Sequence, residues 1–64
     1  MENRMKELRK AQRLSQEGAA SLLGVSRQTI ISIEKGVYNP SLPLAFQIAK
    51  LFDKKIEEVF LFEE

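Results

Sequence analysis

The chain has 64 residues, of which 30% are charged, a formal net charge of +1, and neither cysteine nor histidine. Disulfides and the common zinc and iron sites are therefore excluded, and we expect no metal and no cofactor. A chain of this length supplies one domain, whose stability must come from the packing of its core, with any help that dimerisation gives.

The N-terminal stretch MENRMKELRKAQRL is charged throughout and lacks the apolar segment of a signal peptide. No apolar run approaches the roughly 20 residues that span a bilayer. We therefore expect a cytoplasmic protein without a membrane partner. With a single small domain, no small-molecule effector is expected either.

Charge is distributed unevenly along the chain. Residues 1–13 carry five basic and two acidic side chains, whereas residues 41–64 carry three basic and five acidic ones. Such polarity could orient the molecule on a polyanion. The same charges are also typical of a mixed, soluble surface, which is the simpler interpretation of charge alone.

Apolar spacing and capping residues predict five short helices, so the fold class is all-α. The first covers about residues 2–13, with Met5 and Leu8 at helical spacing. The second begins after Ser15, which is a good N-cap, and ends at Gly24.

A third helix follows after a single intervening residue. Ser26 is its predicted N-cap and Gly36 ends it, so the helix covers about residues 26–35, with Ile30 and Ile33 facing the core.

A turn over residues 38–40 and the N-cap Ser41 lead into a fourth helix, which has Pro43 in its first turn. Residues 56–60 form one last short helical turn.

The link between the second and third helices is the most informative one. A glycine stop, one apolar residue and a serine start force two helices into a tight, steep crossing. That is the geometry of a helix-turn-helix, here about residues 15–36, whose second helix enters the DNA major groove. A helical hairpin in any small bundle can have a similar glycine stop and serine start, so the spacing alone leaves both interpretations open.

The outward face of the third helix carries side chains suited to reading bases. At about 100° per residue, a helix with its isoleucines in the core turns residues 28, 31, 32 and 35 outward, and residue 27 lies at its N-terminal tip. Arginine pairs with guanine and glutamine with adenine through two hydrogen bonds, while serine and threonine contact bases or phosphates. The candidate base-reading residues are Arg27, Gln28, Thr29 and Ser32.

Residue types that contact phosphates surround this face, and the N-termini of helices add their own amides. Each of them singly could be no more than a solvated surface residue, but together they favour a DNA-facing surface. The candidate phosphate contacts are Gln16, Ser26, Lys35, Tyr38, Asn39 and Arg9.

Glu34 projects beside the core isoleucines, where a carboxylate needs a partner. Arg9, on the inward side of the first helix, is the predicted partner. An Arg9–Glu34 pair would tie the first helix to the third and leave a guanidinium edge for a phosphate. The alternative is a half-exposed, unpaired Glu34.

The run LSQEGAASLLGVSRQTIISIEKGVYNPSLPLAFQIAKLF resembles the helix-turn-helix core of the Cro/repressor-type transcription regulators, also called the XRE family. The likeness covers about residues 4–60. It implies a compact five-helix, lambda-repressor-like DNA-binding domain that acts as a homodimer on double-stranded DNA with a two-fold-related operator. It also implies DNA contacts at the positions of Gln16, Arg27, Gln28, Thr29 and Ser32, backbone contacts at Tyr38 and Asn39, and the Arg9–Glu34 pair.

The chain departs from this family in its second helix, where Gly18 and Ala19 replace the usual glutamate and leucine. Glycine inside a helix costs about 1 kcal/mol relative to alanine. The missing leucine removes core volume, which Phe46 is a candidate to refill. Ile31 also places an apolar side chain near the DNA side.

The run of Phe60, Leu61 and Phe62 is strongly apolar, and Leu61 and Phe62 have no evident partner within so small a bundle. A short strand or seam that pairs with a second copy is one interpretation, with a dimerisation segment at about residues 56–64. A frayed terminus is the other.

Together these features predict a sequence-specific DNA-binding transcriptional regulator, most simply a repressor and not an enzyme. Without histidine or cysteine, a catalytic set would depend on serine, lysine and carboxylates, with no cleft to hold them. The alternative is a protein-interaction module, such as the antitoxin of a toxin–antitoxin pair, for which Ile31 and the apolar tail would serve. DNA binding would place the protein on the nucleoid.

Overall fold

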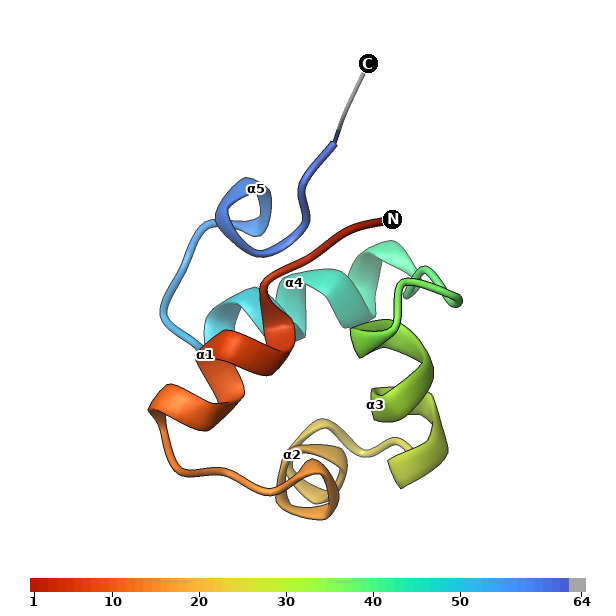
Figure 1. The fold of residues 1–64 in the computed structure, drawn as a ribbon. Coiled ribbons are helices and arrows are strands. Elements are labelled where there is room, and N and C mark those ends of the chain that lie inside the picture. Colours follow the sequence, from red (N-terminus) through yellow and green to blue (C-terminus); the bar gives the residue numbers. More distant parts are fainter. Residues whose placement is uncertain (63–64) are drawn as a thin grey trace.

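A computed structural model describes residues 1–62 of the chain and shows an all-helical fold, as predicted (Figure 1). Within those residues there are five helices. They are α1 (Met5–Ala11), α2 (Gln16–Leu23), α3 (Arg27–Glu34), α4 (Leu42–Leu51) and α5 (Ile56–Val59).

Three of the helices begin at a serine whose hydroxyl accepts a backbone hydrogen bond. The Oγ atoms of Ser15, Ser26 and Ser41 accept from backbone nitrogens three residues further on, at 2.8, 3.1 and 3.3 Å. These bonds satisfy amides that the first turn of a helix leaves without partners. The predicted starts of α2, α3 and α4 are therefore confirmed.

One apolar core holds the helices together. Its largest fully buried side chains come from four different segments of the chain: Met5, Ile30, Ile33, Ile48 and Val59. Ala19 is fully buried as well. Phe46 is 56% exposed, so it does not refill the volume lost at position 19, and that expectation was wrong.

The two ends of the chain pair with each other. Asn3 and Phe60 form an antiparallel bridge, in which Arg4 N donates to Val59 O at 2.8 Å and Leu61 N to Glu2 O at 2.9 Å. Because Asn3 takes part in this bridge and Arg4 N donates to Val59 O, α1 begins later than predicted. Leu61 thus has an intramolecular partner that the sequence did not reveal.

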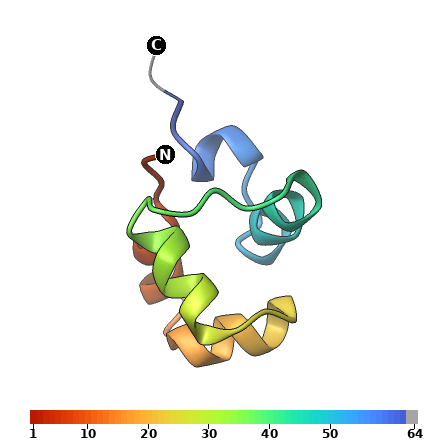
Figure 2. The ribbon, with the colours of Figure 1, turned by 90° about the vertical axis from the view of Figure 1, so that its right-hand side faces the viewer.

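Figures 1 and 2 show the N-terminal segment, residues 1–4, running beside the C-terminal segment, residues 59–62. Glu63 and Glu64, the last two residues of the predicted dimerisation segment, lie outside the described part of the chain. In Figure 2, α2 and the start of α3 lie at one end of the molecule, and both ends of the chain lie at the other. None of the helices described is long and apolar enough to cross a membrane.

Candidate nucleic-acid interface

The candidate interface is built on the tight connection between α2 and α3. Gly24 has a φ of +69°, in the left-handed region that glycine adopts without a steric penalty. Val25 N then donates to Ala20 O at 3.0 Å, and the half-buried Val25 side chain packs against the core. Ser26 caps α3 immediately afterwards, so the direction of α3 is fixed by three consecutive residues.

The four candidate base-reading residues lie in the first two turns of α3 but differ in exposure and in hydrogen bonding. Arg27 and Gln28 are exposed in the first turn, whereas Thr29 and Ser32 are half-buried. The hydroxyl groups of Thr29 and Ser26 lie 2.9 Å apart, within hydrogen-bonding distance, and Gln28 Nε2 donates to Ser32 Oγ at 3.5 Å. Arg27 has no hydrogen-bond or ion-pair partner among the described residues. Its five N–H donors remain open to a ligand.

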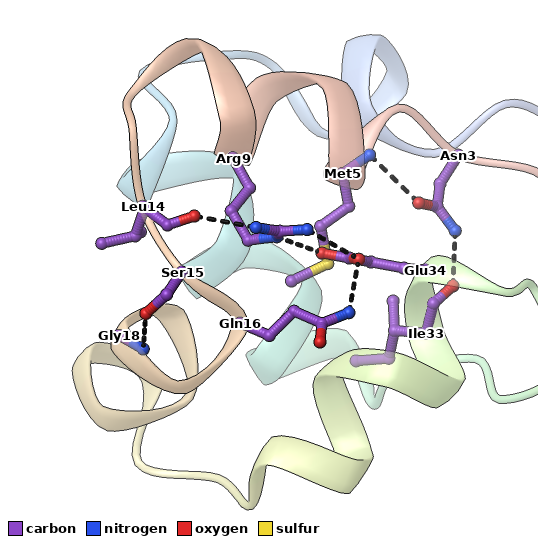
Figure 3. A network of polar contacts seen from close by, with 9 residues as sticks. All are labelled: Asn3, Met5, Arg9, Leu14, Ser15, Gln16, Gly18, Ile33 and Glu34. Atoms are coloured by element: carbon purple, nitrogen blue, oxygen red, sulfur yellow. Dashed lines mark hydrogen bonds and ion pairs between the residues drawn. The ribbon is translucent and has the colours of Figure 1, made fainter.

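Arg9 and Glu34 meet between α1 and the end of α3 (Figure 3). Arg9 Nε donates to Glu34 Oε2 at 2.7 Å and Nη2 donates to Oε1 at 3.3 Å, which gives the two-point geometry that arginine forms with a carboxylate. Their side chains are only 9% and 4% exposed. The half-exposed, unpaired Glu34 is therefore not observed.

Two further hydrogen bonds extend this pair (Figure 3). Arg9 Nη1 donates to Leu14 O at 2.8 Å, which holds the α1–α2 loop, and Gln16 Nε2 donates to Glu34 Oε1 at 3.2 Å. Among the described residues, no buried side-chain nitrogen or oxygen lacks a hydrogen-bond partner. Glu34 thus fixes the positions of two candidate phosphate contacts, Arg9 and Gln16, at once.

A shallow polar pocket lies at this junction. Its lining consists of Arg9, Ser15, Gln16, Glu17 and Arg27. Guanidinium and amide N–H groups are the donors that bind phosphate oxygens in protein–DNA contacts. The Glu17 carboxylate, by contrast, would repel an anion there.

The remaining candidate phosphate contacts lie past the C-terminal end of α3. Lys35 and Tyr38 are exposed, and the Tyr38 and Val37 amides both donate to Ser32 O. Asn39 is exposed, and its Oδ1 accepts from the Met1 nitrogen at 3.2 Å. Arg9 and Gln16 also contact the C-terminal end of α3, through Glu34, whereas Ser26 lies at its N-terminal end.

Apart from the buried Arg9, the basic side chains in and beside α1 lie on the surface. Lys6, Lys10 and Arg13 are exposed. Arg4 Nη2 donates to Glu7 Oε2 at 2.8 Å, and this hydrogen bond to the carboxylate raises the pKa of Arg4 above its ordinary value.

The predicted dimer residues are only partly exposed. Phe60 and Leu61 are half-buried, and Phe62 is 77% exposed. Phe60 and Phe62 line a largely apolar groove with Leu42, Ala45 and Ile56, and its other lining residues are Met1, Asn39, Pro40 and Glu57.

The sequence analysis missed the contribution of α4 to this apolar surface. Leu42 and Phe46 are 64% and 56% exposed. They are four residues apart, and therefore on one face of α4. The signal was present in the sequence, because the inward face of α4 is already filled by other apolar residues.

Comparison with known proteins identifies close relatives. The model of a helix-turn-helix family matches residues 5–59. An uncharacterised HTH-type transcriptional regulator of Methanocaldococcus jannaschii is 58% identical over 64 residues, which cover 100% of this chain and 97% of that protein. YgzD of Bacillus subtilis, also an uncharacterised HTH-type transcriptional regulator, is 52% identical over 64 residues, with 100% and 97% covered.

A solved structure gives the same result for the fold. The crystal structure of the restriction-modification controller protein C.AhdI from Aeromonas hydrophila superposes with a TM-score of 0.79. The two chains are 38% identical, and the match covers 89% of this chain and 86% of that one.

Proposed function

Because the chain belongs to the XRE-type helix-turn-helix family of transcriptional regulators, we propose that it is a homodimeric repressor that reads an inverted-repeat operator through the major groove. It carries a helix-turn-helix DNA-binding domain and is not an enzyme. The proposal concerns the assembly, the operator and the sign of regulation.

The observation that carries the proposal is the start of α3. Arg27 and Gln28 are exposed in its first turn, on the helix that follows the tight turn at Gly24. The N-terminal residues of a recognition helix are the ones that reach base edges in helix-turn-helix proteins. Arg27 is suited to guanine and Gln28 to adenine, with Thr29 and Ser32 completing the base-reading face.

Phosphate contacts would hold α3 in register on the duplex. Gln16, Ser26 and the buried Arg9 would meet the backbone on one side of the groove, and Lys35, Tyr38 and Asn39 would meet it on the other. The exposure of Lys35, Tyr38 and Asn39 past the C-terminal end of α3 supports the second group of contacts.

Dimerisation would use the apolar groove beside the C-terminal segment. Phe60, Leu61 and Phe62 would pack against a second copy, because two recognition helices must lie about 34 Å apart to read successive half-sites. The exposure of Leu42 and Phe46 next to the groove supports a protein contact there.

The repressor would act in the cytoplasm, on DNA of the nucleoid, and be controlled by its own concentration.

Selection from a pool of random duplex DNA tests this proposal. The purified protein should enrich an inverted repeat with half-site centres about one helical turn apart at about 150 mM salt. The Arg27→Ala variant, as control, should lose preference at one position in each half-site. Weak, salt-sensitive binding without enrichment would contradict the proposal.

The second candidate function is a protein-interaction module, such as the antitoxin of a toxin–antitoxin pair. The observation that favours it is the exposed apolar surface of Leu42, Phe46 and Phe62. A heterologous partner that covered these residues in place of a second copy, together with failure of the operator selection, would favour this function.

A further inference from the structure

The N-terminal segment lies between two parts of the molecule that the proposed function uses separately. On one side it pairs with the C-terminal segment through the Asn3–Phe60 bridge. On the other side it reaches the C-terminal end of α3 (Figure 3). The segment therefore links the proposed dimer surface to the recognition helix through hydrogen bonds.

The Asn3 side chain makes three hydrogen bonds, all with backbone groups, and the longest runs from its Nδ2 to Met1 O at 3.4 Å. Its Oδ1 accepts from Met5 N at 3.0 Å, which caps the start of α1, and its Nδ2 donates to Ile33 O at 2.8 Å. Ile33 lies in the last turn of α3, and its carbonyl oxygen also accepts from Gly36 N at 2.9 Å. The Asn3 bonds to Met5 N and Ile33 O are partly buried, where a hydrogen bond is weakened less by water.

The backbone on either side of Asn3 belongs to the pairing of the chain ends. Glu2 O accepts from Leu61 N at 2.9 Å and Arg4 N donates to Val59 O at 2.8 Å. Gly36, just after α3, adds a second point of close approach, since a Cβ built there would lie 3.1 Å from Met1 O. A displacement of the C-terminal segment would thus be passed through residues 2–4 to the end of α3.

We propose that Asn3 is a positioning residue that ties the recognition helix to the dimer surface and so sets the half-site spacing the protein accepts. The inference rests on the proposed homodimeric function. A dimer reads two half-sites at the distance at which it holds its two recognition helices. The Asn3–Ile33 hydrogen bond restricts movement of each α3 relative to the surface on which the two copies meet. The dimer therefore binds operators with altered half-site spacing less tightly.

The sharpest variant is Asn3→Asp. A carboxylate still accepts from Met5 N and keeps the start of α1 capped, but it has no N–H to donate to Ile33 O. Asn3→Ala removes all three side-chain hydrogen bonds and serves as a second variant. The matched control is Gln12→Ala, because Gln12 Nε2 also donates from a side-chain amide to a distant backbone carbonyl, Leu51 O at 3.4 Å.

Affinity is measured for the selected operator and for versions lengthened or shortened by one base pair between half-sites. In Asn3→Asp and Asn3→Ala the preference for the best spacing should fall by about fivefold, the net effect of one hydrogen bond. Binding to an isolated half-site should stay unchanged, and Gln12→Ala should keep the wild-type preference. An unchanged spacing preference in a folded Asn3→Asp dimer would overturn the inference.

A measurement on the wild-type protein keeps the inference testable if neither variant folds. The amides of Gly36, Val37 and Tyr38 donate to carbonyls of Ile33 and Ser32 at the end of α3. Their hydrogen exchange should slow when dilute monomer associates, while exchange of the Val25 amide in the α2–α3 turn stays constant. If the exchange rate of each of these four amides were the same in the monomer and in the dimer, the inference would be overturned.

The two levels of proposal fail in different ways. A wild-type protein that selects no inverted repeat would contradict the homodimeric repressor itself. A wild-type protein that selects one, beside an Asn3→Asp variant with the same spacing preference, would contradict only the role of Asn3.

Discussion

Glu34 accepts three hydrogen bonds from two side chains, Arg9 and Gln16, while its own side chain is almost fully buried. Replacing it with alanine leaves the buried Arg9 charge without a counter-charge, which typically costs about 3–5 kcal/mol. We expect Glu34→Ala to lower the free energy of unfolding, measured by urea denaturation, by about this amount.

An exposed ion pair provides the control for that prediction. Arg4 and Glu7 also lie 2.8 Å apart, but both side chains are largely exposed. Exposed pairs contribute little, so Glu7→Ala should leave the denaturation midpoint almost unchanged. If Glu34→Ala changed the unfolding free energy by less than about 0.5 kcal/mol, as typical surface changes do, Glu34 would not hold the buried network.

Gly24 and Gly36 form a natural pair for a second test. Both have positive φ, +69° and +76°, but nothing lies within 4 Å of a Cβ built on Gly24, whereas one on Gly36 would lie 3.1 Å from Met1 O. Alanine in the left-handed region costs about 1–2 kcal/mol at either site. Thermal melts should therefore show a larger loss of stability for Gly36→Ala than for Gly24→Ala. Equal losses would mean that the N-terminal segment moves away from position 36 without an energetic cost.

Arg27 and Lys35 should differ in the way they affect DNA binding. Arg27→Ala should weaken operator binding by about 1–3 kcal/mol and relax the preference at one base position. Lys35→Ala should weaken binding equally for all sequences and lower the salt dependence by about one counterion. Titrations at several salt concentrations with matched and mismatched operators measure both effects. A sequence-independent loss for Arg27→Ala would make Arg27 a phosphate contact.

At the scale of helices, local signals were sufficient where a cap and a glycine enclosed an element. The third helix was predicted at residues 26–35, and α3 is Arg27–Glu34, because Ser26 and Gly36 mark its ends with chemistry visible in the sequence. The first helix was predicted at residues 2–13 and is Met5–Ala11. Its start depends on pairing with residues 59–61, which no local pattern reveals.

In the candidate site, too, some contacts could be predicted from the sequence and others could not. Arg9 and Glu34 were paired on the basis of their faces and charges, and the structure places them 2.7 Å apart. The role of Asn3 had no signal in the sequence, because its partner is a backbone carbonyl 30 residues away. Side-chain complementarity can be predicted from residue types, whereas a bond to a distant peptide group depends on the finished fold.

The end of α4 carries a strained residue that can be relieved. Asp53 has a φ of +54°, and Lys54 N donates to Ala49 O at 3.0 Å across it, which is the arrangement in which helices commonly end at glycine. Asp53→Gly should raise the unfolding free energy by about 0.5–1 kcal/mol, measured by urea denaturation.

The neighbouring position is the control for Asp53. Lys54 does not have positive φ, so Lys54→Gly should only add conformational entropy to the unfolded chain and lower stability. If Asp53→Gly also lowered stability, interactions of the Asp53 side chain would outweigh the backbone strain.

For the whole molecule, association and folding can be separated by changing an exposed apolar side chain. Phe62 is 77% exposed beside the apolar groove, and Leu22 is 64% exposed on α2, outside that groove. A charge at the centre of a dimer contact is strongly unfavourable. Sedimentation equilibrium should therefore show a monomer for Phe62→Asp and an unchanged dimer for Leu22→Asp, with similar circular dichroism for both. If both variants remained dimers, the dimer interface would have to lie elsewhere on the molecule.

The pairing of the chain ends also bears on the order of folding. Asn3 and Phe60 are far apart in the sequence, so joining them closes a loop around nearly the whole chain, which costs more entropy than the contacts within α2 and α3. The bridge should thus form after the helical core and open before it. Such local opening is a low-energy state of a native protein, and here it would release the segment that holds Asn3 against Ile33. The contact that forms last in folding and opens first would then be the one that fixes the distance between the recognition helix and the dimer surface.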